Sequence, residues 1–94
     1  MISIVKLIDA LKLAQAGYKY ADAVNQRKAE QRVLEQAYIG WKREAGIGFV
    51  AKNSEEWFEM MEATAAEYAA VRRAKRREQY RRDALLMLAG GNHD

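Results

Sequence analysis

The sequence predicts an all-α protein, a long antiparallel helical hairpin, and three observations lead to this prediction. Proline is absent from the 94 residues, and only six glycines occur. Alanine, glutamate, lysine, arginine, glutamine and leucine dominate, a composition typical of long helices. Apolar residues recur at steps of three and four in two long segments, as on one face of a helix. At this length we expect a single helical domain over residues 1–94.

The first predicted helix covers residues 3–45. Its opening part carries an apolar stripe of seven residues: Ile4, Leu7, Ile8, Leu11, Ala14, Tyr18 and Ala21. The pattern weakens over the polar stretch 25–32 and resumes at Val33. A bend or break near 25–32 is therefore an open alternative, although continuity is favoured because no proline or turn dipeptide interrupts the stretch.

A loop over residues 46–53 is predicted to separate the two helices. Gly46 follows the last periodic residue, where a glycine suits a left-handed C-cap. Asn53 with Glu56 three residues later resembles a capping box, and Ser54 is the alternative N-cap.

The second predicted helix covers residues 54–89 and is followed by a tail over 90–94. Its apolar stripe consists of Trp57, Met61, Thr64, Tyr68 and Val71. The same face continues with Lys75, Glu78 and Arg82, so we expect the apolar core to end near Val71 and to return at Leu85.

Two helices alone cannot enclose a core, so we expect a homo-oligomer with coiled-coil packing, or docking into a larger protein assembly. The residues expected at this protein interface are the large apolar ones on both helices: Trp57, Phe58, Met61, Tyr68, Trp41, Ile4, Ile8 and Leu11.

The strongest functional signal is a basic run between Val71 and Asp83. Like charges four residues apart cost about 0.2–0.5 kcal/mol per pair in an exposed helix, so an acidic partner is expected to lie against them. DNA, RNA and an acidic protein surface all fit, since arginines bind phosphates and Tyr80 can stack on a base. A solvated helix face is the alternative. The residues predicted to bind are Arg72, Arg73, Lys75, Arg76, Arg77, Tyr80, Arg81 and Arg82.

An acidic run precedes the basic one, with Glu55, Glu56, Glu59 and Glu62 and no base among them. A solvated helix start is favoured, because the helix dipole stabilises carboxylates there. The alternative is a docking face for a basic partner, including the basic run of a second copy.

Catalytic chemistry is not expected. Cysteine is absent and the single histidine is His93; no motif for nucleophilic catalysis accompanies it. We predict no catalytic residues, no cofactor, no metal site and no small-molecule substrate. A solvated tail is favoured over a metal site at Asn92-His93-Asp94, and a helix terminator over a phosphate loop at Gly46-Ile-Gly48.

The N-terminal amphipathic stretch, residues 2–20, permits contact with a membrane surface, but a buried bundle face is favoured. Charges at Lys6, Asp9 and Lys12 interrupt its apolar run. We therefore expect neither a signal peptide nor a transmembrane helix, and a cytoplasmic or virion-associated protein.

The stretch QAGYKYADAVNQRKAEQRVLEQAY between an apolar helical opening and a basic helical end resembles small helical virion proteins of tailed phages, of the internal or ejection-associated type. The resemblance implies a non-enzymatic structural protein that packs along DNA, a portal or copies of itself. Two alternatives stay open: a nucleic-acid-binding regulatory or packaging accessory protein, and a small helical inhibitor of the anti-host or anti-CRISPR type.

Overall fold

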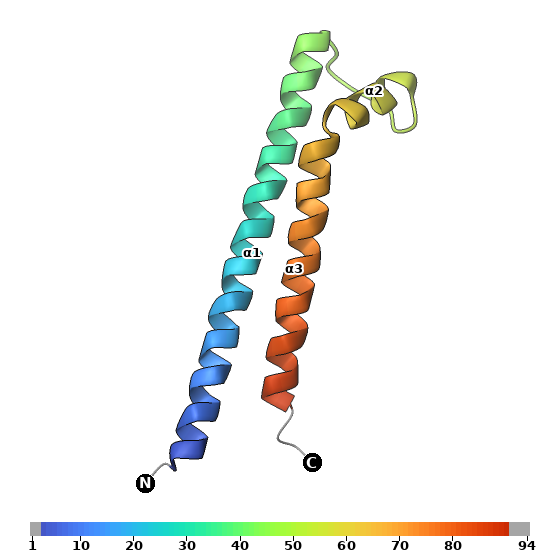
Figure 1. Ribbon diagram of the computed structural model, residues 1–94. Coiled ribbons are helices and arrows are strands. Elements are labelled where there is room, and N and C mark those ends of the chain that lie inside the picture. The colour runs from blue at the N-terminus through green and yellow to red at the C-terminus, as the bar shows by residue number, and fades with distance from the viewer. Residues whose placement is uncertain (1–2, 91–94) are drawn as a thin grey trace.

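The computed structural model describes residues 3–90 and confirms the helical hairpin. Its elements are α1 (Ile4–Ala45), α2 (Glu55–Ala63) and α3 (Ala65–Gly90). The long helices α1 and α3 lie antiparallel, and the short α2 lies at the closed end of the hairpin (Figure 1). The molecule is a rod of 67 × 22 × 17 Å with a radius of gyration of 20.1 Å. A compact domain of this length would have a radius of gyration of about 12 Å.

Helix α1 is continuous across the polar stretch 25–32, as favoured from the sequence. At its start, the Ser3 hydroxyl accepts a hydrogen bond from the backbone N–H of Lys6 at 3.2 Å. At its end, Gly46 adopts φ 70°, and the N–H of Ile47 donates to the carbonyl of Lys42 at 2.9 Å. This left-handed closure confirms the predicted glycine C-cap, because such a φ favours glycine.

Helix α2 begins with a side-chain cap from Ser54, the alternative to Asn53. The Ser54 hydroxyl accepts from the N–H of Trp57 at 3.2 Å, and Glu55 and Glu56 fill the first turn. Asn53 instead adopts φ 68° in the turn before the helix, a conformation that asparagine tolerates better than most residues.

The single helix predicted over 54–89 is interrupted at Thr64, which corrects that prediction. The Thr64 hydroxyl donates to the carbonyl of Met60 at 2.7 Å, while the Thr64 N–H also donates to it at 3.0 Å. A threonine that bonds the carbonyl four residues back often bends a helix. The chain therefore turns between α2 and α3 here. At the other end, α3 includes Gly90 of the predicted tail, and residues 91–94 lie outside the described part.

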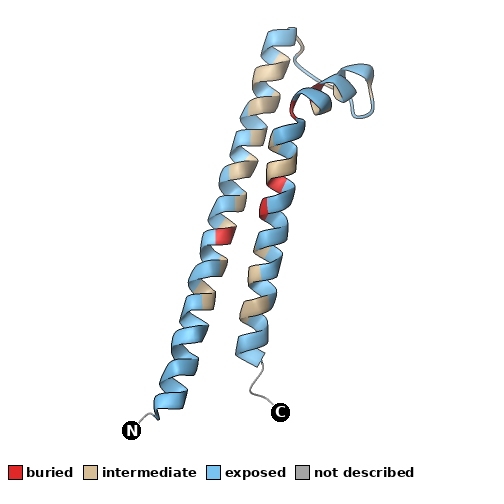
Figure 2. Ribbon diagram, in the orientation of Figure 1, coloured by how far each residue is buried: buried red, intermediate tan, exposed pale blue. Residues whose placement is uncertain are grey.

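The core of the hairpin is small and lies toward its closed half (Figure 2). The buried side chains within residues 3–90 are Ala23, Met60, Thr64, Val71 and Ala74. Two of these five are alanines, so the helices approach closely but bury little area per residue. Near the open end, where α1 begins and α3 ends, both helices are mostly exposed (Figure 2).

The N-terminal apolar stripe does not face α3, so the favoured buried bundle face is not formed within one chain. Ile4, Leu7 and Leu11 are all more than half exposed. Helix α1 instead packs on α3 through a different face, which includes the half-buried Tyr20 and the buried Ala23. Periodicity identified an apolar face correctly but did not say which surface would cover it.

An ion pair joins α1 and α3 in the segment where polar residues replace the apolar ones in the core-facing positions of α3. Arg27 binds Glu78 with two hydrogen bonds, Nε to Oε2 at 3.0 Å and Nη2 to Oε1 at 3.1 Å, and donates a third to Gln31 at 3.0 Å. Glu78 thus faces α1 as its position in the stripe predicts, and Arg27 satisfies it there. Bidentate geometry makes this contact more specific than a simple ion pair.

The Arg27–Glu78 pair predicts a loss of stability in acid. Hydrogen bonding from Arg27 holds the pKa of Glu78 below its ordinary value of 4.5, against the opposing effect of desolvation. The pKa of Glu78 is lower in the folded state than in the unfolded state. The ion pair therefore stabilises the hairpin at pH values above 4.5, and this stabilisation is lost as the pH falls through the lowered pKa. The melting temperature, followed by circular dichroism, should drop by a few degrees more in the wild type than in Glu78→Gln.

The matched control is Glu35→Gln, because Glu35 is exposed and forms no ion pair with any residue between 3 and 90. The melting temperature of this variant should fall with pH as it does in the wild type. Identical acid profiles for Glu78→Gln and the wild type would contradict the assignment.

Candidate interaction surface

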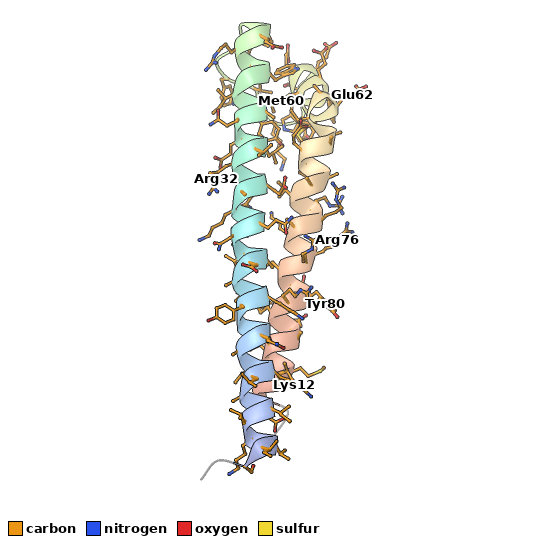
Figure 3. The ribbon with its side chains drawn as sticks, turned by 60° about the vertical axis from the view of Figure 1, so that its left-hand side comes forward. Lys12, Arg32, Met60, Glu62, Arg76 and Tyr80 are labelled. Carbon is orange, nitrogen blue, oxygen red and sulfur yellow. The ribbon has the colours of Figure 1, made fainter. Side chains whose placement is uncertain are left out.

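The cations of the basic run predicted from the sequence form a surface that wraps around α3 instead of lying on one side of it, with Arg81 half-buried and the others exposed. Val71, Ala74 and Glu78 are turned toward α1, and Arg72 and Arg76 lie on the opposite side of the helix. Figure 3 shows Arg76 projecting away from α1. We call this surface the basic face and define it by the seven cations Arg72, Arg73, Lys75, Arg76, Arg77, Arg81 and Arg82.

The charges of the basic face are hardly neutralised by the chain itself. Within residues 3–90, one of the seven cations has an ion-pair partner, Arg82, whose Nε lies 3.7 Å from the carboxylate of Asp83. Arg77 donates to the side-chain oxygen of Gln26 at 2.7 Å, which fixes its position but leaves its charge uncompensated. The like-charge repulsion expected from the sequence is therefore present in the folded hairpin.

Tyr80 adds an aromatic ring to the basic face. Its side chain is 67% exposed, and it follows Arg76 by one helical turn. The guanidinium carbon of Arg81 lies 5.6 Å from the ring centroid, within the range of a cation–π contact. An exposed ring among cations is the arrangement on which single-stranded nucleic acids stack.

Two lysines of α1 extend the cationic surface across the groove between the arms, and sequence reasoning missed them. Lys12 and Lys19 line a shallow pocket together with Arg81. Their spacing of seven residues places them on one face of α1. That spacing was visible in the sequence, but their approach to Arg81 depends on the register between the helices.

Helix α2, at the closed end of the rod, carries the opposite charge. Glu55, Glu56, Glu59 and Glu62 are all exposed on α2, and Figure 3 shows Glu62 pointing outward at this end. The molecule therefore carries acidic, basic and apolar surfaces in sequence from its closed end to its open end.

The residues predicted at the protein interface fall into two separate groups. At the closed end, Trp41, Trp57 and Met61 are half-buried within the chain, and the hydroxyl of Tyr38 donates to the Met61 sulfur at 3.6 Å. Phe58 packs edge-on against Trp57 with ring centroids 4.9 Å apart.

The remaining predicted interface residues are exposed. Phe58 and Tyr68 lie at the closed end, and Ile4, Ile8 and Leu11 lie near the open end. The structure therefore does not join the predicted interface into one patch. It separates a partly internal cluster from an outward apolar stripe.

No group of three or more metal-binding side chains gathers among residues 3–90. His93, the only histidine, lies outside the described residues. Across the same residues, none of the helices has a stretch that is both long and apolar enough to span a bilayer.

Comparisons with protein-family models, curated proteins and solved structures found no match to this chain.

Proposed function

We propose that this chain is a non-enzymatic assembly protein that associates with copies or neighbours and holds its basic face against an acidic surface. The observation that carries the proposal is the uncompensated charge of the basic face. Repulsion among these cations weakens the free helix, and an anionic partner would relieve it. A rod with this charge is suited to lying along an extended surface.

The shape and polarity of the molecule favour an assembly role over the inhibitor alternative. The rod offers several exposed surfaces at different positions along 67 Å, and a small inhibitor needs one. The resemblance of the sequence to small virion proteins of tailed phages makes a phage particle the setting that we propose.

Nucleic acid is a second candidate for the acidic surface, and a specific observation supports it. Tyr80 stands exposed beside arginines, and an acidic protein surface would give its ring no particular role. Phosphate binding by this face would release counterions, so the affinity should fall steeply with salt.

Charge reversal on the basic face tests the proposal. In Arg72→Glu/Arg76→Glu, binding to a fluorescent DNA fragment at low salt should weaken by about tenfold or more, because two phosphate contacts become repulsive. The slope of log affinity against log salt should become shallower by about 2. Fluorescence anisotropy at several salt concentrations measures both.

The matched control is Lys28→Glu/Arg32→Glu, which makes the same charge change on exposed positions of α1. Figure 3 shows Arg32 projecting from the side of α1 away from α3. Equal weakening by both variants would contradict the assignment to α3. If DNA does not bind at low salt, the nucleic-acid candidate fails, and the same variants measured with polyglutamate test an acidic protein surface.

A further inference from the structure

The outward apolar stripe of α1 has the spacing of a coiled-coil seam. Without Ile8, its residues are spaced by three, four, three, four and three, and they fill positions a and d of three successive heptads. We call this set the outer seam: Ile4, Leu7, Leu11, Ala14, Tyr18 and Ala21. After Ala21 the same positions become polar, beginning with Asn25, so the outer seam is about 27 Å long.

The outer seam lies on the side of α1 that α3 leaves free. Tyr20, Ala23 and Arg27, which are turned toward α3, occupy heptad positions c and f, on the far side of the helix from a and d. The large residues along the stripe, Ile8 included, are 45% to 76% exposed. Nothing between residues 3 and 90 covers this face.

A second outer seam, laid antiparallel, is complementary to the first. In an antiparallel coiled coil each a residue faces a d residue of the partner. Aligning residues 4–21 of two copies places Ile4 opposite Ala21, Leu11 opposite Ala14, and Leu7 opposite Tyr18. Large residues then face small ones in two of the three types of layer, which is how tight cores interdigitate. A parallel pair would instead stack Ala14 on Ala14 and Tyr18 on Tyr18.

The positions that flank the outer seam permit close approach. Position g is occupied by Ala10 and Gly17, and the antiparallel alignment brings Ala10 of one copy beside Gly17 of the other. A Cβ built on Gly17 would meet no atom of its own chain within 4 Å. The hairpin itself therefore gives no reason for a glycine at this helical position, whereas a closely packed second helix does.

The charges along the edges of the outer seam do not oppose the pairing of two copies. The flanking positions e and g of residues 4–21 carry no charged side chain, so two copies do not repel each other there. The first charge beyond them, Asp22, would lie at the level of the N-terminus of the other copy's α1. That first turn contains no acidic residue of its own, and a helix N-terminus favours a carboxylate.

The available area suits a dimer. Five large side chains on each copy, those of Ile4, Leu7, Ile8, Leu11 and Tyr18, are largely exposed. At about 100 Å² each, two copies would bury about 1,000 Å², the lower end for a specific interface.

From these observations we infer that a second copy of this chain binds the outer seam, with the two α1 helices antiparallel over residues 4–21. The inference rests on the assembly role proposed above and gives it a geometry. The open ends of two hairpins overlap, and their basic and acidic segments extend in opposite directions.

Light scattering on the full chain tests the inference. The wild type should have twice the 10.8 kDa mass of one chain, and Leu7→Glu/Leu11→Glu should have the mass of one chain. Circular dichroism should show unchanged helicity in this variant, because both residues are exposed in the hairpin. The control Val33→Glu, exposed on α1 beyond the outer seam, should remain dimeric.

Disulfide trapping tests the direction. The natural chain has no cysteine, so introduced thiols are unambiguous. Ile4→Cys/Ala21→Cys should give a covalent dimer, and Ile4→Cys alone should not. Within one copy these positions are about 25 Å apart along α1, too far for an internal disulfide.

Several results would overturn the inference: a wild-type mass of one chain, a Leu7→Glu/Leu11→Glu variant that stays dimeric, or trapping through Ile4→Cys alone. A monomer that binds phosphatidylglycerol vesicles through Leu7 and Leu11 would assign the face to membranes instead. Failure here would leave the binding of the basic face intact, because the two tests alter different helices.

Discussion

Replacing Val71 by aspartate should separate the two long helices. Val71 is 4% exposed and is one of five buried side chains between residues 3 and 90. Burying a valine contributes about 1.5–3 kcal/mol, and an unpaired carboxylate in its place adds a desolvation cost of several kcal/mol. A domain of this size has a total stability of about 5–14 kcal/mol, and a small core places this hairpin toward the low end.

Loss of helicity is the expected readout for Val71→Asp. Helix α3 has 26 residues and carries the self-repelling basic face, so without α1 it should be marginal in water. Circular dichroism during urea titration should show a much lower midpoint. The control is Val33→Asp, at a valine of α1 that is 52% exposed, and its midpoint should stay near that of the wild type. Equal midpoints for the two variants would contradict the placement of Val71 in the core.

The helix ends could be predicted from the sequence because their causes are local. Gly46 ends α1 through its own backbone conformation, and Ser54 begins α2 through a bond to a residue three positions away. Such signals need no knowledge of the rest of the fold. Continuity of α1 over 25–32 follows for the same reason, because a break would need a local cause that is absent.

The interruption at Thr64 was harder to predict, although its cause is local too. Thr64 occupies an apolar stripe position, where its methyl group suits the core, so the pattern conceals the break. Its hydroxyl bonds the carbonyl of Met60, an interaction that threonine makes in continuous helices as well. Whether the helix merely bends or is divided depends on the packing of α2 against α1.

The sequence predicts which residues make up each surface, but not where the fold places each surface relative to the other helix. The basic face follows from composition and period alone. The approach of Lys12 and Lys19 to Arg81 depends on the register between α1 and α3, which a helical period does not specify. The direction of the N-terminal stripe depends on which face of α1 binds α3. The Arg27–Glu78 pair favours the face that carries Arg27, so the stripe points away from α3. A face that contains a half-buried arginine is not the one that hydrophobicity would select.

Replacing Met60 by alanine should release α2 from the rest of the hairpin. Met60 is 6% exposed, and truncating a buried methionine costs about 2–5 kcal/mol. Thr64 already separates α2 from α3, so α2 can swing away without breaking the regular turns of α3. The expected result is a local opening at the closed end, with the long helices still paired.

Tyr38 reports this opening. Burial, together with the nearby Tyr68, raises the pKa of Tyr38 above its ordinary value of 10.0, and Tyr38 touches Met61 of α2. When α2 leaves, the pKa of Tyr38 should return toward 10.0, which ultraviolet titration of the tyrosines detects, and the fluorescence of Trp57 should shift to the red. Met87→Ala is the matched control, because Met87 is 77% exposed and neither signal should change. An unchanged tyrosine titration in Met60→Ala would mean that α2 is held mainly by Trp57 and Met61, since Met60 would then contribute little to its docking.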